Sequence, residues 1–211
     1  MPRSTALAAG KAADDMWDSG RRPPAPRPQA GKGPRVQRTL TAVVAGSLLV
    51  AACGTGPPSG PDRAAAEAAI QAAVVRQLVE FDNTFGPDHR FTELLVVGHV
   101  ETHAGDPKRR GEPGASLADG QRSAIRAAVE HLAPVRFINN RYDYIRQDVL
   151  QPTIPGSVII TLAPVEFDNK GATVGANLWC GGTCGLWLTY RLTEEPDDWT
   201  VTGTEGPWSI S

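Results

Sequence analysis

Apolar residues recur with a helical period over residues 62–81. Offsets of four, four and three place them on one stripe of an α-helix: Ile70, Val74, Leu78 and Phe81. Alanines fill most of the other positions and favour a helix. Asp62 is predicted to cap this helix by accepting a hydrogen bond from a free backbone amide.

A second helix is predicted over residues 117–132, where apolar residues again lie near one face. Ser116 and Asp119 have the spacing of a capping box in which aspartate replaces glutamate. Between the two helices, residues 91–102 form a strand-compatible apolar run. Residues 104–114 carry the Gly and Pro turn signals of a loop.

The remainder of the chain has the pattern of β-structure. Short apolar segments alternate with turn signals over residues 135–138, 157–165, 172–179, 186–193 and 199–203. Short connections favour antiparallel neighbours, so the C-terminal strands are expected to form a β-meander. We therefore predict a single α+β domain over residues 62–211, with two helices packed on an antiparallel sheet.

An apolar segment from Leu40 to Ala52 follows the basic residues Lys32, Arg35 and Arg38. Basic residues before a short apolar core are typical of an export signal. The segment is too short for a membrane-spanning helix, which needs about 20 apolar residues. We therefore expect a signal peptide over residues 35–52; a buried core helix is the alternative.

The residues Val50-Ala51-Ala52-Cys53 end this segment and resemble a bacterial lipobox. The resemblance implies that Cys53 carries a diacylglycerol and attaches the protein to the cell membrane on its extracytoplasmic face. It implies no activity. Residues 53–61 have the composition of a tether between lipid and domain.

Residues 1–34 are rich in Pro, Arg, Ala and Gly, and we expect them to be a disordered extension. Signal peptides normally begin near their basic region. We therefore hypothesise that translation starts later, at Val36 read as an initiator; a basic cytosolic tail is the alternative.

Charge divides the chain at the same place. Residues 1–52 contain 8 basic and 3 acidic residues, whereas residues 53–211 contain 13 basic and 20 acidic residues. An acidic domain lacks the basic footprint of proteins that bind phosphate backbones, so no nucleic-acid partner is expected. The membrane, reached through the lipidated Cys53, is the expected partner.

The stretch Trp179-Cys180-Gly-Gly-Thr-Cys184-Gly185 lies between two predicted strands. A tight hairpin would place Cys180 and Cys184 within disulfide reach, and export makes the bond favourable. Metal ligation and redox activity are the alternatives. The glycines would also let a partner approach the 180–185 loop, so an envelope polymer or a protein partner is expected there.

This stretch, with Trp187-Leu-Thr-Tyr190 and the terminal Gly206-Pro-Trp-Ser-Ile-Ser211, resembles a group of exported bacterial proteins of uncharacterised function. The group shares a W-C-G-G-x-C-G hairpin, an aromatic strand and a last strand with a tryptophan. The resemblance covers about the last 55 residues. It implies paired cysteines and no catalytic residue.

Three further motifs contain groups that bind ligands. His99, Glu101 and His103 alternate, so on a strand they would share one face and provide three zinc ligands; a solvated strand face is the alternative. Lys108-Arg109-Arg110 is a basic patch suited to an acidic envelope polymer or a lipid headgroup, or else a solvated loop. Arg141-Tyr-Asp-Tyr144 has the composition of a binding rim, or of an ordinary half-buried element.

No residue set identifies a reaction. The sequence has no G-x-S-x-G motif, no P-loop and no dinucleotide fingerprint. We therefore predict no catalytic residue and no cofactor, and expect a lipid-anchored cell-envelope protein that acts as a binding or structural module. The alternative is a metal-dependent extracellular hydrolase centred on His99, Glu101 and His103.

Overall fold

The computed structural model describes residues 58–211, apart from residues 87 and 197. The expected extension, the signal peptide, the lipidation at Cys53 and most of the tether therefore lie outside the described residues. Within the described part of the chain, no helix is long and apolar enough to cross a membrane.

The described residues form two α-helices, one 3-10 helix and eleven strands. The helices are α1 Gly60–Glu80, α2 Asp119–Val129 and the 3-10 helix η1 Arg141–Tyr144. The strands before the C-terminal half are β1 Leu94–Val97, β2 His99–Glu101, β3 Pro113–Ser116, β4 Val135–Ile138, β5 Ile145–Arg146 and β6 Gln151–Pro152. The remaining strands are β7 Val158–Leu162, β8 Glu166–Asp168, β9 Gly171–Gly181, β10 Cys184–Glu194 and β11 Trp199–Ile210.

The predicted α+β class is confirmed, and the large sheet is mixed. Its strand order is β11-β10-β9-β7-β1-β4, with β8 beside β9. Strands β9, β10 and β11 form the expected antiparallel meander, and β7 is antiparallel to β9. Strand β1 is parallel to both β4 and β7. The parallel pair β1–β4 arises because α2 connects the two strands as a crossover.

The helix α1 has the predicted stripe but a different start. Ile70, Val74 and Leu78 are fully buried. The predicted cap at Asp62 is wrong: Ser59 occupies the N-cap position, and Asp62 lies in the first turn. A carboxylate in the first turn still favours the helix, because it complements the positive end of the helix dipole. Phe81 follows the helix and is 56% exposed.

The helix α2 begins two residues later than predicted. Ala118 occupies the N-cap position, and its backbone N–H donates a 2.7 Å hydrogen bond to Oε1 of Gln121. The predicted box of Ser116 and Asp119 is therefore wrong, because the glutamine three residues after Ala118 performs the reciprocal part of the motif. Ile125 and Val129 bury the apolar face of the helix.

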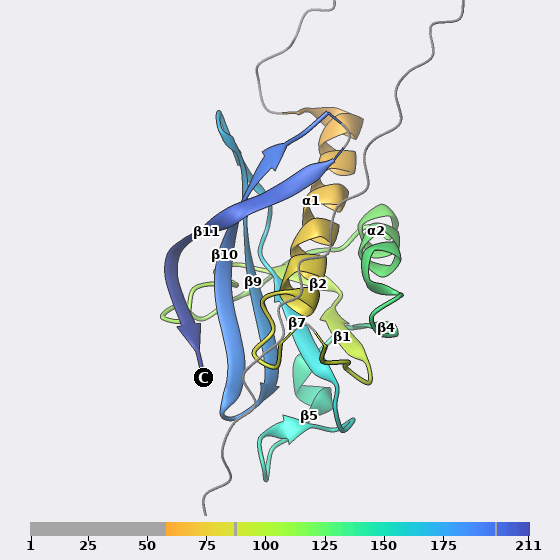
Figure 1. The fold of residues 1–211 in the computed structure, drawn as a ribbon, viewed down its shortest axis with the longest axis vertical. Helices are drawn as coiled ribbons and strands as arrows, with labels where there is room; N and C mark the ends of the chain where they lie inside the picture. The colour runs from red at the N-terminus through yellow and green to blue at the C-terminus, as the bar shows by residue number, and fades with distance from the viewer. Residues whose placement is uncertain (1–57, 87, 197) are drawn as a thin grey trace, which may run out of the picture. The chain divides into compact units, whose positions relative to one another are not determined.

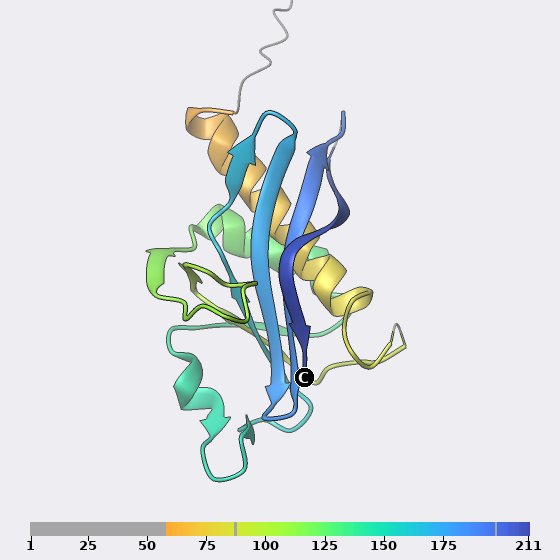
Figure 2. The same ribbon diagram turned by 90° about the vertical axis from the view of Figure 1, so that its left-hand side faces the viewer.

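Both α-helices lie on the same side of the large sheet (Figures 1 and 2). The main core joins apolar side chains of α1 and α2 to those of β9, β10 and β11, and includes the buried Tyr190. On the opposite face, a smaller cluster of Leu95, Val97, Ile138 and Ile159 packs against Tyr144 and its neighbours. Strands β1 and β7 are buried throughout, as expected for central strands covered on both faces.

The strand predicted over residues 91–102 is divided at Gly98. The N–H of Gly98 donates to the carbonyl of Ile138, and its carbonyl accepts from the N–H of Leu117. Strand β2 therefore leaves the large sheet and pairs with β3 as a separate two-stranded ribbon. The residues between β2 and β3 form most of the loop predicted over residues 104–114; Pro113 and Gly114 instead belong to β3, which pairs with β2.

Candidate functional site

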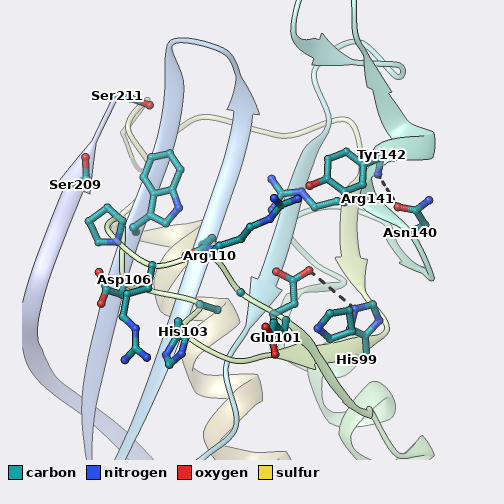
Figure 3. Close-up of a pocket in the computed structure, with 18 of the residues that line it drawn as sticks. His99, Glu101, His103, Asp106, Arg110, Asn140, Arg141, Tyr142, Ser209 and Ser211 are labelled. Atoms are coloured by element: carbon teal, nitrogen blue, oxygen red, sulfur yellow. Dashed lines mark hydrogen bonds and ion pairs between the residues drawn. The ribbon is translucent and has the colours of Figure 1, made fainter.

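A pocket of about 940 Å³ opens where the β2–β3 ribbon meets the large sheet. Its lining comes from several separate parts of the chain, and we call it the polar pocket. Most residues between His99 and Pro113 line it, together with residues 139–142, Asn177 of β9, Trp187 of β10, and Ser209 and Ser211. Figure 3 shows these side chains converging from the ribbon, from η1 and from the end of β11. The volume is within the range of about 300–1,000 Å³ that small-molecule sites occupy.

The loop between β2 and β3 is held on the sheet at its N-terminal end. Gly105 has a φ of +90° and donates its N–H to Oδ1 of the buried Asn177 at 2.6 Å. The carbonyl oxygen of Ala104 lies so close to Gly175 that a Cβ there would overlap it. Glycine at both positions therefore lets the loop lie directly on the sheet.

The loop is also closed at its base. The N–H of Thr102 donates to the carbonyl of Glu112, and the N–H of Glu112 donates to Oγ1 of Thr102 at 3.0 Å. The charged residues between these two fastening points are thereby presented along one wall of the pocket.

Gly185 positions the opposite wall. A Cβ at Gly185 would lie 2.5 Å from Cη2 of Trp187, so only glycine leaves room for the indole ring. Gly185 also exchanges two backbone hydrogen bonds with Ser211, of 3.1 Å and 2.9 Å. Both Trp187 and Ser211 line the polar pocket, so the glycine after the hairpin determines this part of its surface.

His99, Glu101 and His103 all line the pocket, but they do not share a strand face. His99 and Glu101 lie on β2, with Nε2 and Oε1 4.0 Å apart (Figure 3). His103 lies beyond the end of the strand, in a turn with a φ of +63°. Among the described residues, no group of three or more His, Cys, Asp or Glu side chains is arranged to hold a metal ion. The alternation of side chains along a strand, on which the zinc hypothesis depends, therefore ends at Glu101, and His103 does not share the face of His99 and Glu101.

The polar pocket contains three arginines from two of the motifs identified in the sequence. Arg109 and Arg110 come from the loop, and Arg141 comes from η1, whereas Lys108 does not line the pocket. None of the three guanidinium groups forms an ion pair or hydrogen bond with another described residue. Nε of Arg141 is buried and has no hydrogen-bond partner there.

Arginines elsewhere on the domain provide a contrast. Nη1 of Arg191 lies 2.7 Å from Oδ2 of Asp168, and Nη2 lies 3.0 Å from Oε2 of Glu205. Nε of Arg136 lies 2.9 Å from Oε1 of Glu93. The hydrogen bond from Arg191, with a second from the backbone of Lys170, lowers the pKa of Asp168. Some arginines of the domain are thus paired with carboxylates, whereas the three of the pocket, like Arg76 and Arg126, have no ion pair among the described residues.

The 180–185 loop lies outside the polar pocket. Cys180 and Cys184 are at disulfide-bonding distance at the tip of the β9–β10 hairpin, with Cα atoms 5.1 Å apart. The N–H of Gly182 donates a 2.7 Å hydrogen bond to the carbonyl of Leu150. Cys180 instead lines a second, smaller pocket of about 350 Å³, together with Phe85 and His89.

Sequence reasoning does not identify several residues of the site, among them Asn177, Trp187, Asp106, Glu112 and Asn140. The sequence places Trp187 only in an aromatic strand and gives Asn177 no role. A signal for Asn177 is present: it is an amide within the apolar run of β9, and it is buried. A buried polar side chain needs a hydrogen-bond partner, and here that partner is the loop that carries the charged residues.

Comparison with protein-family models, with curated proteins and with solved structures finds no match for this chain. Its function is therefore inferred from the geometry of the polar pocket and from the sequence motifs that precede the described domain.

Proposed function

We propose that the chain is a lipid-anchored binding module of the cell envelope, facing outward from the membrane, and that its ligand enters the polar pocket. One observation carries the proposal: separate parts of the chain build a pocket of about 940 Å³ with three guanidinium groups that have no ion-pair partner among the described residues. Arg109 and Arg110 are exposed, whereas Nε of Arg141 is buried and has no partner among the described residues. A partly buried charge without a partner gains the most from a bound ligand.

The construction of the pocket also supports recognition. The charged residues lie on a loop that is fastened to a sheet by Gly105 and by the Thr102–Glu112 pair. Binding residues commonly lie on surface loops that a rigid scaffold positions. Asn177 belongs to that scaffold, because its side chain holds the loop and lines the pocket.

The proposed location depends on sequence. Val50-Ala51-Ala52-Cys53 resembles a lipobox, and the W-C-G-G-x-C-G stretch resembles a group of exported bacterial proteins. A cysteine pair at disulfide-bonding distance suits an oxidising compartment. The anchor predicts a mature protein that starts at Cys53 and carries a diacylglycerol.

Intact mass of the protein from a membrane fraction tests the anchor. We expect a mass that begins at Cys53 with a lipid increment, and release of a Cys53→Ala variant from the membrane. An unlipidated chain that retains its N-terminus would overturn the proposed location.

Calorimetry tests the pocket. The full chain in detergent is titrated with an anionic, a neutral and a cationic trisaccharide of equal length, and with short peptides. At least one probe should give saturable heat that is lost in Ser209→Trp, which fills the pocket wall, and retained in Ser123→Trp on the exposed surface of α2. If no probe gives heat that depends on the pocket, the assignment as a binding module is overturned.

A further inference from the structure

We infer that the polar pocket binds an acidic saccharide, with the carboxylate of one sugar unit held between Arg110 and Arg141. This inference rests on the proposed function, because it names the ligand class of the same site. It is argued from the charge, the hydrogen-bonding groups and the aromatic side chains that line the pocket.

The two arginines come from different elements and meet in the pocket. Arg110 lies on the loop after β2, Arg141 begins η1, and the side chain of Arg110 extends across the pocket toward Arg141 (Figure 3). Two like charges that face a common space repel each other unless an anion lies between them. The planar guanidinium group presents paired donors that match the two oxygens of a carboxylate.

Burial of Arg141 strengthens this argument. Its Nε is closed off from solvent and has no partner in the described structure, so the guanidinium group is only partly hydrated. A partly desolvated cation gains more from an anionic partner than a fully hydrated cation does. The terminal nitrogens of Arg141 are the donors available to such a partner.

The other charges in the pocket favour an anion of single charge. Glu101, Asp106 and Glu112 also line the pocket, and three carboxylates would repel a dianion such as phosphate more strongly than a monoanion. The same carboxylates can accept hydrogen bonds from hydroxyl groups. One carboxylate combined with several hydroxyl groups describes a uronic-acid sugar.

Two aromatic residues complete the match. Trp187 lines the wall beside Gly185, and Tyr142 lies on the rim with 58% of its surface exposed. Aromatic rings with a polar edge are suited to a ligand that has one apolar face and several polar groups. A sugar ring has such an apolar face in its C–H groups. A volume of about 940 Å³ exceeds that of one sugar ring, so a short oligosaccharide fits.

The test compares trigalacturonate with its methyl ester, which has the same rings and no charge. Calorimetry of the full chain should show that trigalacturonate binds at least tenfold more tightly than the ester. Arg141→Gln and Arg110→Gln should each remove most of that difference. Arg76→Gln, on the exposed surface of α1 and outside the pocket, should leave it unchanged.

A second variant separates charge from shape. Tyr142→Ala should weaken the acid and the ester by the same factor, because the ring contacts the sugar and not its carboxylate. Circular dichroism and thermal unfolding establish that each variant is folded. Because Tyr142 is exposed, this variant keeps the inference testable even if Arg141→Gln fails to fold.

The outcomes distinguish this inference from the proposed function. Equal affinity for acid and ester, or undiminished preference for the acid in both arginine variants, would overturn the acidic saccharide. Tighter binding of inorganic phosphate at the same residues would overturn it as well. Heat from a neutral or cationic probe that is lost in Ser209→Trp would leave the binding module standing without this ligand class, whereas absence of any such heat overturns both.

Discussion

The hydroxyl group of Tyr190 donates a 2.9 Å hydrogen bond to Oδ2 of Asp82, and so joins β10 to the segment that follows α1. Tyr190 is fully buried, and Nε2 of Gln77 donates to both carboxylate oxygens of Asp82. The carboxylate thus accepts hydrogen bonds from both the helix and the sheet. This is a polar contact between the two layers that enclose the core.

Replacing Tyr190 by phenylalanine should destabilise the domain. Hydrogen bonds to a charged acceptor contribute about 1.5–3 kcal/mol, and the partial exposure of Asp82 places the expected loss at about 1–2 kcal/mol. Urea unfolding of the full chain measures the change. Tyr142→Phe, on an exposed side chain, is the control and should change stability by less than about 0.5 kcal/mol. Equal stability of the two variants would contradict the prediction.

Stability should fall at alkaline pH because of the same residue. Burial, with the charge of Asp82, raises the pKa of Tyr190, whereas an unfolded tyrosine has a pKa of about 10. Below pH 10 both states keep the proton and the stabilisation is complete. As pH rises above 10, only the unfolded chain releases it, so stability falls by at most about 1.4 kcal/mol per pH unit from this group.

Urea unfolding at several pH values between 8 and 11 measures this dependence. Tyr190→Phe should have a smaller alkaline slope than the unmodified chain, since it lacks the titrating hydroxyl group. An identical slope in the two proteins would show that Tyr190 is not the group responsible.

Gly175→Ala should destabilise the domain and loosen the pocket wall. The added Cβ would overlap the carbonyl oxygen of Ala104, so the loop must move away from the sheet. Overpacking of this kind typically costs about 1–3 kcal/mol. Gly203→Ala, where the new Cβ meets nothing, is the matched control in β11. The two thermal midpoints are compared, and a loss of stability in Gly203→Ala alone would contradict the proposed packing.

Removing the hairpin disulfide should have a modest and local effect. The bond between Cys180 and Cys184 closes a very short loop, for which chain entropy gives about 2 kcal/mol or less. Hydrogen exchange should accelerate at residues 178–186 in Cys180→Ser/Cys184→Ser and stay unchanged in α2. Global acceleration would mean that the hairpin stabilises the whole domain.

Zinc should not bind at micromolar concentration. His99 and Glu101 supply at most two ligands, and His103 lies beyond the strand, whereas zinc sites use three or four protein ligands. Calorimetry with zinc chloride is the measurement. Saturable heat that disappears in both His99→Ala and His103→Ala would reinstate the hypothesis of a metal-dependent hydrolase.

The pattern of apolar and polar residues predicted helices and strands well where their side chains are buried in the core. The apolar run over residues 157–165 predicts a buried strand and contains β7, whose five residues are all buried, and the stripe of α1 is buried as expected. Strand β11 extends to Ile210 rather than ending at residue 203. Glu205, Gly206 and Pro207 resemble a turn in sequence, but an edge strand pairs on one side only and tolerates them.

The parallel pairing and the pocket depend on contacts between distant residues. Leu94 pairs with both Val135 and Val158, and no local period encodes those partners. The sequence separately indicated the His99–His103 motif, the basic patch at Arg109 and the rim at Arg141. It did not indicate that these three join in one pocket, because β2 and η1 meet only through the tertiary fold.

Residues that hold the β2–β3 loop to the sheet and residues that supply side chains to the pocket lie next to each other in the sequence. Ala104 and Gly105 hold the loop to β9, whereas Asp106, Arg109 and Arg110 supply side chains to the pocket. Exchanging the second group leaves the first group and its contacts in place. A library randomised only at Arg109 and Arg110 would therefore diversify what the domain recognises while sampling a single scaffold, because the Asp106 carboxylate still accepts the N–H of Lys108 and shapes the loop. Hypervariable loops in natural recognition proteins work in the same way.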